Sequence, residues 1–291
     1  MNSFISVRQK LQKIDNLPTL PAVAGRLLEI LSSDNTSMSQ IADILATDPS
    51  LTGRVLKVSN SAYFGVTKKI DTIRLALVVL GMKEINNILL SISLFKTFDG
   101  VGKNFDLKEF WLHSIAVGYL SQYIFKHFGI SSHGEEFTAG LIHQIGKIIL
   151  EQFFHDDFIE ILDLINDENL SDLEAEEKVL GVTHPDLGAW LARKWRIPAN
   201  LVEAIRYHRM PEYAQKNKLL PAVVNISNSI ANYYEIGMST GKEHYDPHTA
   251  PGWKIIEEKI ERKINLEEFI ESVADKKEDI IQYAESTFRI K

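Results

Sequence analysis

Apolar residues along this chain recur every three or four positions, which is the spacing of an α-helix that packs one face on a core. Val23, Leu27 and Ile30 form one such stripe, and the period continues with few interruptions toward the C-terminus. Segments with the alternating pattern of β-strands are scarce. The pattern predicts an all-α protein built as a multi-helix bundle.

Capping residues mark helix boundaries within this pattern. Asp48 stands before a proline, a combination that favours a helix start, and Ser171 with Glu174 forms a capping box at another start. Residues 72–81, TIRLALVVLG, fit a strand or a buried helix, and the short connections on both sides favour the helix. Residues 135–154, EEFTAGLIHQIGKIILEQFF, are expected to form one helix.

A loop rich in glycine and asparagine, FDGVGKNFD, divides the pattern. We expect three parts: a helical N-terminal subdomain over residues 1–104, a second helical bundle over 105–237, and a C-terminal helical appendage over 238–291 that packs on one of them. A chain of 291 residues buries roughly 75% of its unfolded surface and needs no covalent or metal staple to fold.

The composition narrows the class of protein. The chain contains no cysteine, which excludes disulfides, thiol nucleophiles and thiolate metal sites and fits a reducing compartment. No apolar run approaches the ~18 residues that a membrane span needs, and the N-terminus lacks the pattern of a signal peptide. We therefore expect a cytoplasmic protein with no membrane partner.

Charge is distributed unevenly around a formal net charge of −7. Residues 50–96 carry seven basic and two acidic side chains, whereas residues 151–180 carry eleven acidic side chains and one basic side chain. Both stretches fit solvated helix faces. They also fit a dipolar molecule that meets a partner through its basic N-terminal part.

Nucleic-acid binding is disfavoured by the net negative charge but has one local feature in its favour. Residues 38–60 have the outline of a helix-turn-helix, with Arg54 and Lys57 on the second helix. The apolar residues of the same stretch, among them Ile41 and Leu45, also fit simple packing of the N-terminal bundle, and we prefer that interpretation. A nucleic-acid-binding regulator is kept as a lower alternative.

Four histidines fall on four successive helices of the second bundle: His113, His143, His184 and His208. Each alone fits a hydrogen-bonded core histidine. Together they fit a metal site, because imidazole is the commonest metal ligand and bundle sites are built from inward side chains on facing helices. Gln144 follows His143 where a carboxylate would give a His–Asp metal dipeptide, and an amide is a weak, neutral ligand.

Several segments between residues 12 and 236 resemble the HDOD family, a degenerate branch of the HD-domain metal-dependent phosphohydrolases. They are LPTLPAVAGRLLEIL, IADILATDPSLTGRVLKVSNSAYFG, FWLHSIAVGYLS, TAGLIHQIGKIIL, HPDLGAWLARKWRIPANLVEAIRYH and LPAVVNISNSIAN. The resemblance implies an HD-domain-like all-α bundle. It also implies a role in bacterial signal transduction, because members of the family are signalling or regulatory proteins.

By this resemblance, His113 matches the first metal-ligand histidine of an HD enzyme and His143 the histidine of the His–Asp dipeptide. Gln144 replaces the aspartate of that dipeptide. Asn228 stands at or near the position of the last catalytic aspartate. Both acids that hydrolysis uses are therefore amides in this chain.

The same resemblance assigns His184 and His208 to the extra histidines that hold a second metal in some HD branches. Lys147 matches a lysine that often follows the dipeptide and could approach a substrate phosphate. From its helix position alone, Lys147 is expected to extend its ammonium group from an apolar helix to solvent.

We expect a catalytically silent signalling module that binds a protein partner or a small-molecule signal. No cofactor is certain. The alternative is a metal-dependent phosphohydrolase whose histidines hold a single Zn, Fe or Ni ion. A partner surface is predicted at the SNSAYFG stretch, formed by Tyr63, Phe64, Lys68 and Lys69. The two aromatic residues could instead cover the N-terminal bundle.

Overall fold

The computed structural model describes residues 11, 17–31, 37–46, 48–98, 100, 105–131, 134–168, 170–237 and 246–288. Regular structure in these ranges is helical throughout, as the sequence predicts. In chain order the helices are α2 (Ala22–Leu31), α3 (Met38–Ala46), α4 (Pro49–Ser59), η1 (Ala62–Phe64), α5 (Ile73–Leu80), α6 (Met82–Thr97), α7 (Leu107–His127), α8 (Glu135–Ile142), α9 (Ile145–Phe153), α10 (His155–Glu168), α11 (Asp172–Leu180), α12 (His184–Lys194), α13 (Ala199–Tyr207), η2 (Pro211–Tyr213), α14 (Leu219–Tyr233), η3 (Pro247–Thr249), α15 (Gly252–Ile260), α16 (Leu266–Ala274) and α17 (Lys277–Phe288).

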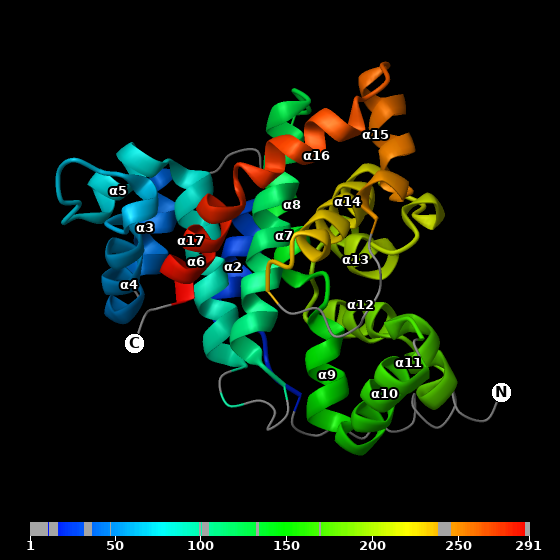
Figure 1. Ribbon diagram of the computed structural model, residues 1–291. Coiled ribbons are helices and arrows are strands. Elements are labelled where there is room, and N and C mark those ends of the chain that lie inside the picture. Colours follow the sequence, from blue (N-terminus) through cyan, green and yellow to red (C-terminus); the bar gives the residue numbers. More distant parts are fainter. Residues whose placement is uncertain are drawn as a thin grey trace.

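The helices form two groups joined by a central pair. Helices α2 to α6 lie at one end, α7 and α8 cross the middle, and α9 to α13 lie at the other end (Figure 1). Helix α6 is the core of the first group, and its residues 85–94 are all buried. The core of the second group is α14, which packs on α7, α8, α13 and α15.

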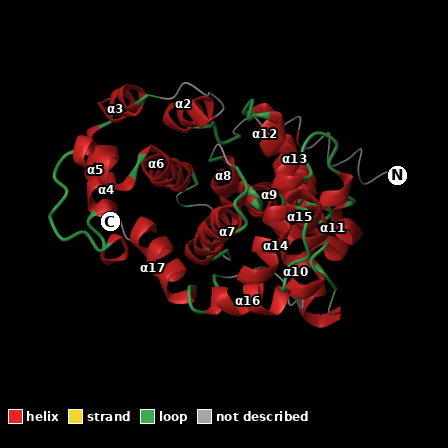
Figure 2. Cartoon of the chain, turned by 90° about the horizontal axis from the view of Figure 1, so that it is seen from above, coloured by secondary structure: helices red, strands yellow, loops and turns green. Residues whose placement is uncertain are grey.

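The C-terminal helices contact both groups. Helix α15 packs on α14, whereas α17 packs on α7, α6 and η1. Seen from above, α16 and α17 run along one side of the molecule back toward the first group (Figure 2). The last helices therefore join the two groups, rather than resting on one of them as expected. The predicted boundaries at residues 104 and 237 border segments outside the described ranges.

Two predicted helix starts are confirmed in atomic detail. The Asp48 carboxylate accepts a hydrogen bond from the Ser50 backbone N–H at 2.9 Å, at the first turn of α4. The capping box of α11 is complete, because Ser171 Oγ accepts from the Glu174 N–H and the Glu174 carboxylate accepts from the Ser171 N–H. These bonds satisfy backbone donors that a helix start leaves without partners.

The single helix predicted over residues 135–154 is wrong. The chain leaves α8 after Ile142 and begins α9 at Ile145, with His143 and Gln144 in a turn between them. Gln144 has φ −103° and ψ 15°, outside the helical region. The turn changes the direction of the chain at the residue pair that carries the candidate chemistry.

Glycines on both sides of this turn explain how it is held. A Cβ on Gly140 would overlap the backbone of Gly118 on α7, and a Cβ on Gly146 would overlap the His184 carbonyl and the Gly188 nitrogen of α12. Helix α8 therefore lies directly on α7, and α9 directly on α12, backbone against backbone. The two contacts fix His143 between them.

Helix α5 forms where predicted but is not buried. Its side chains Leu75, Val78 and Val79 are 37%, 67% and 50% exposed. Ala76 and Leu77 are buried, and Ile73 and Leu80 pack against the core while partly exposed. Among the described residues, none of the individual helices could cross a membrane by length and hydropathy. Helices α5 and α6 pass the test only as a pair across a 116° bend.

The helix-turn-helix outline of residues 38–60 has a packing explanation. Ile41, Leu45, Leu51 and Val55, on α3 and α4, are 3% exposed or less and belong to the hydrophobic core. Packing of these residues in the core accounts for the helical period of the segment, so nucleic-acid binding is not needed to explain it.

We predict that Gly146→Ala lowers the free energy of unfolding by about 3 kcal/mol, because the added methyl overlaps the backbone of α12 and α9 must move. Gly53→Ala is the matched control, since a Cβ at that helical glycine meets nothing within 4 Å. The control should be neutral or stabilising by about 0.5–1 kcal/mol. Urea unfolding of both variants measures the difference, and equal stability would contradict the backbone contact.

Candidate functional site

The structure brings the four predicted histidines together in a row between the central pair and the second group. His113, His143, His184 and His208 have no exposed surface. Ring centroids lie 5.6 Å apart between His113 and His143, 5.0 Å between His143 and His208, and 5.5 Å between His208 and His184. Helix α7, the α8–α9 turn, the start of α12 and the end of α13 each supply one ring.

Three of these rings are fixed through Nδ1 by backbone carbonyls. The pairs are His113 with Ile236 at 3.2 Å, His143 with Gly140 at 2.6 Å and His208 with Ile205 at 2.8 Å. A carbonyl oxygen only accepts, so each neutral ring carries its proton on Nδ1. Their Nε2 atoms therefore present lone pairs to the interior.

Asn228 lies where two of these lone pairs converge. Its side-chain oxygen position is 2.9 Å from His113 Nε2 and 3.2 Å from His143 Nε2. An oxygen there cannot bond an unprotonated nitrogen, so the amide is satisfied when its NH₂ group faces the rings and donates to both. This orientation gives up the 3.2 Å bond that Asn232 Nδ2 would donate to an oxygen at the same position, and Asn232 keeps its 2.8 Å bond to the Asn228 backbone carbonyl. An ionised aspartate at this position could not supply these donors.

Gln144 lies beside this arrangement but is not part of it. Its side chain is buried, and its Nε2 group has no hydrogen-bond partner within the described part of the chain. The same holds for the Nε2 atoms of His184 and His208. Of the two predicted amide positions, the structure therefore places Asn228 against the imidazoles and leaves Gln144 without such a contact.

The fourth histidine is fixed by a carboxylate. Glu176 lies 2.8 Å from His184 Nδ1 and accepts the His184 backbone N–H at 2.7 Å. Asp172 lies one turn earlier on α11, and burial together with the Asp172 charge raises the pKa of Glu176 well above its usual value. Acids three or four residues apart on a core-facing helix are the sequence signal that could have identified this pair.

Lys147 is not extended to solvent, and that prediction is wrong. It is 1% exposed, and its Nζ lies 2.9 Å from Asp172 Oδ2. Arg209 adds a second cation 3.5 Å from Asp172 Oδ1. The Lys147 and Arg209 charges hold the pKa of Asp172 well below its usual value, against the effect of burial. Part of the acidic stretch therefore belongs to the interior and not to a solvated face, since Glu151 is buried as well.

The donor types present are those that bind transition metals, but their arrangement does not favour a resident ion. In the described ranges, one group of three metal-ligating side chains has its ligand atoms within 4.8 Å of one another: Asp172, Glu176 and His184. Lys147 and Arg209 already neutralise Asp172 and would repel a divalent cation. The four imidazoles form a row and not such a group, and two of them converge on an amide.

Burial keeps all four imidazoles neutral. It lowers the pKa of His113 to about 4 and, as the largest cause in each case, lowers the pKa values of His143, His184 and His208 well below 6.5. Neighbouring rings add to the effect, because a proton on one disfavours a proton on the next.

The predicted partner surface is divided in two by the structure. Tyr63 and Phe64 are half-buried under α17, where the Tyr283 ring lies 5.0 Å from Tyr63 and 6.3 Å from Phe64. Lys68 and Lys69 are exposed. The aromatic residues thus pack between the N-terminal group and the C-terminal helix and are partly exposed, whereas the two lysines are fully on the surface.

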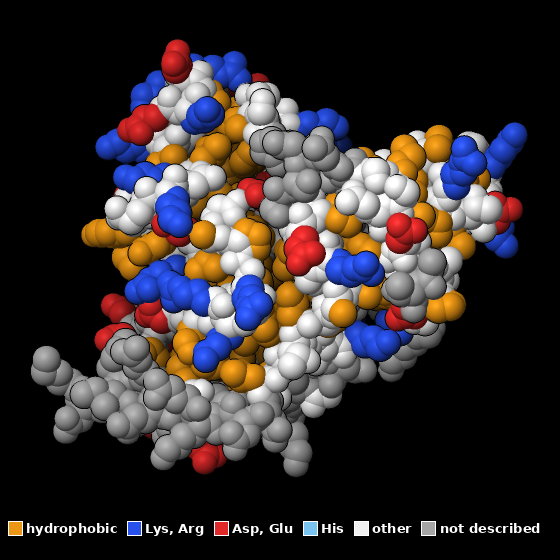
Figure 3. Space-filling view, turned by 180° about the vertical axis from the view of Figure 1, so that it is seen from behind, with side chains coloured by type: hydrophobic (Ala, Val, Ile, Leu, Met, Phe, Trp, Pro, Cys, Tyr) orange, Lys and Arg blue, Asp and Glu red, His pale blue; other side chains and the backbone are white. Residues whose placement is uncertain are grey.

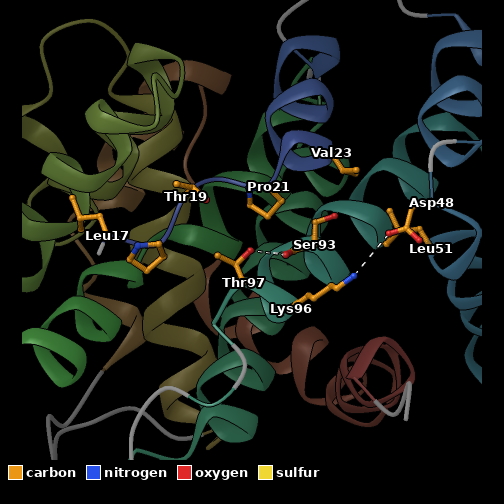
Figure 4. Close-up of a pocket in the computed structure, with 10 residues that line it drawn as sticks. Leu17, Thr19, Pro21, Val23, Asp48, Leu51, Ser93, Lys96 and Thr97 are labelled. Atoms are coloured by element: carbon orange, nitrogen blue, oxygen red, sulfur yellow. Dashed lines mark hydrogen bonds and ion pairs between the residues drawn. The ribbon is translucent and has the colours of Figure 1, made fainter. Parts of the chain in front are cut away.

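A large cavity lies away from the histidines. It has a volume of about 720 Å³ and lies between the segment 17–21, the start of α4 and the end of α6. Lys96 and Asp48 form its charged end, 4.0 Å apart, with Ser93 and Thr97 beside them (Figure 4). None of the four histidines lines it. Trp195, just past α12, donates its indole N–H to the Pro18 carbonyl at 2.8 Å and so holds one wall.

We predict that Lys147→Met lowers the free energy of unfolding by about 3–5 kcal/mol, because it removes one cation from a fully buried carboxylate. Lys178→Met removes the same charge from the exposed pair with Glu168 and should cost less than about 1 kcal/mol. Thermal and urea unfolding of the two variants give the comparison. Similar small losses would show that Asp172 is not held by Lys147.

Stability should fall on acidification below pH 6.5. The four histidines stay neutral in the folded protein but bind protons in the unfolded chain. Each histidine therefore lowers the free energy of unfolding by up to about 1.4 kcal/mol for every pH unit below its unfolded pKa of 6.5. Glu84 and Glu176, whose pKa values burial raises, oppose the trend, so the net loss per pH unit is smaller than the sum over the four histidines. Urea unfolding between pH 5 and 7 measures the slope, and a flat profile would contradict the neutral, buried row.

Three comparisons place this architecture among known proteins. A family model for the HDOD domain matches residues 17–211. An HDOD domain protein of unknown function from Geobacter sulfurreducens has a TM-score of 0.89 at 22% identity, over 99% of both chains. A proposed phosphohydrolase from Shewanella amazonensis SB2B has a TM-score of 0.74 at 24% identity, over 96% of this chain and 97% of that one.

An uncharacterised protein from Treponema pallidum (strain Nichols) is 23% identical over 225 residues. The match covers 77% of this chain and 44% of the relative, so the chain spans less than half the length of that protein. Similarity at these identities establishes a shared fold and says nothing about whether this chain shares an activity with the relatives. Since the family model covers more than half of the chain and a solved member has the same helical architecture throughout, the chain belongs to the HDOD family.

Proposed function

We propose that this protein is a catalytically silent signalling module, in which the histidine bundle is a rigid scaffold for binding a protein partner or a small ligand. The observation that carries the proposal is Asn228. Its amide can satisfy His113 and His143 at once, in the place where a hydrolase uses a carboxylate to hold a cation. The Nε2 atoms of His113 and His143 therefore have a hydrogen-bond donor without a metal.

Two further features support a scaffold. Lys147 and Arg209 neutralise the buried charge of Asp172, so no metal ion is needed to do so. The cavity bounded by Lys96 and Asp48, about 720 Å³ in volume, lies within the range of small-molecule sites and apart from the imidazoles. The cysteine-free composition supports a cytoplasmic location.

A metal-dependent phosphohydrolase is the second candidate. The Asp172, Glu176 and His184 group favours it, and so do the Nε2 atoms of His184 and His208, which have no partner among the described residues. A single Zn, Fe or Ni ion would be the expected metal. Protein purified without a histidine tag, analysed for metals and assayed with phosphodiester and nucleotide substrates, separates the two candidates. Bound metal with turnover that disappears in His143→Ala would overturn the silent scaffold.

Asn228→Asp tests the amide directly. We predict a loss of about 2–4 kcal/mol in metal-free buffer, because the variant places an acceptor against two imidazole lone pairs. Added Zn²⁺ or Mn²⁺ should restore the melting temperature of the variant and leave the parent protein little changed, since the carboxylate creates the missing ligand.

Asn225→Asp is the matched control on the same helix. Asn225 is buried and donates to the His208 backbone carbonyl at 2.9 Å, so its replacement also removes a donor. It lies against a carbonyl and not against Nε2 atoms, and we expect destabilisation without rescue by metal. Equal rescue of both variants, or strong stabilisation of the parent protein by metal, would contradict the assignment of Asn228.

A further inference from the structure

The exposed face of α5 is the clearest apolar surface among the described helices. Leu75, Val78 and Val79 follow the i, i+3, i+4 spacing of one helix face and are 37%, 67% and 50% exposed. Helix α3 packs beside α5 and begins with Met38, which is 50% exposed. Four of the seven most exposed large apolar side chains therefore belong to these two helices.

Positive charge borders this face. Arg74 is one helical turn before Val78, and Lys68 and Lys69 lie in the segment that leads into α5. That segment is held by Asn60, whose side chain bonds the Ile70 N–H and carbonyl, both at 2.7 Å. Lys68, Lys69 and Arg74 are exposed and have no ion pair with any residue in the described part of the chain. We name Leu75, Val78, Val79, Lys68, Lys69 and Arg74 the basic pole.

The complementary surface lies on α10. Asp156, Glu160, Asp163 and Asp167 are exposed and spaced i, i+4, i+7 and i+11, so they form one acidic stripe along the helix. None of the four has an ion pair within the described residues. Like charges at these spacings destabilise a helix, and a cationic partner would relieve the repulsion. We name these four residues the acidic pole.

The two poles cannot meet within one molecule. Helix α5 lies at one end and α10 at the other, in both ribbon views (Figures 1 and 2). From behind, hydrophobic and Lys or Arg side chains lie next to one another on the end that carries α3 to α5 (Figure 3). The molecule is thus dipolar despite its net charge of −7.

We infer that the basic pole is a docking surface for a second copy of this chain. The basic pole of one molecule binds the acidic pole on α10 of the next. The contact joins two different surfaces, so copies associate head to tail and each added molecule leaves one pole of each kind free. Half-buried Ile159 and Leu162 on α10 offer apolar contacts for Val78 and Val79 beside the acidic stripe. The inference does not depend on whether the histidines hold a metal.

The experiment is sedimentation of the full chain at increasing concentration in low and high salt. At ~50 mM salt the weight-average mass should rise past that of a dimer, and at ~500 mM the association should weaken at least about tenfold. A monomer at ~100 μM protein in low salt overturns the inference. Binding to vesicles of anionic lipid without self-association also overturns it and assigns the basic pole to a membrane.

Two variants test each pole separately. Val78→Ser with Val79→Ser removes the apolar centre of the basic pole, and Asp163→Asn with Asp167→Asn neutralises the acidic stripe. Each variant alone should be monomeric. A mixture of the two retains one intact pole of each kind and should form a dimer of one copy of each and nothing larger. Assembly of either variant alone, or no dimer in the mixture, contradicts head-to-tail contact.

The control removes the same charge elsewhere. Glu258 and Glu271 are exposed on α15 and α16, away from both poles, and Glu258→Gln with Glu271→Gln lowers the net negative charge as much as the α10 variant does. If general repulsion alone governed association, both double variants would associate more strongly than the parent protein. We expect the control to assemble like the parent and the α10 variant to lose assembly. All variants replace exposed residues, and circular dichroism with thermal melting verifies their folding.

Discussion

The buried ion pair between Lys147 and Asp172 constrains the whole second group of helices. Its two charged atoms lie 2.9 Å apart with each side chain 1% exposed, and separating them would leave a charge in a low-dielectric interior. The pair joins α9 to α11, and Arg209 at the end of α13 approaches the same carboxylate. Three helices are thereby held around the histidine row, and the position of His184 follows from Glu176 one turn along α11.

Most of the fold could be predicted from the sequence, because helical period and capping are local. The start of α4 at Asp48 and the capping box of α11 depend on residues within one turn, and both were predicted. The break at Gln144 depends on Gly146 meeting the backbone of α12, a contact between residues far apart in sequence. Periodicity identifies an apolar stripe but cannot say whether a partner covers it, which is why α5 was expected to be buried.

The histidines of the candidate site could be predicted from the sequence, but its buried charged residues could not. Histidines on successive core helices are conspicuous because histidine is an uncommon core residue and the commonest metal ligand. Asp172 and Glu176 stand in a run of acids that looks like a solvated surface, and a count of charges cannot separate the buried members from the exposed ones. Lys147 was misjudged for the same reason, since its counter-ion comes from a different helix.

Helix α12 connects the histidine row to the large cavity. It begins with His184 in the imidazole row, and the residue after its last, Trp195, bonds the Pro18 carbonyl at the wall of the large cavity. Its eleven helical residues form a rod about 16 Å long. Helix α12 thus links Pro18 at the wall of the cavity to His184 in the histidine row through one hydrogen bond and one continuous helix.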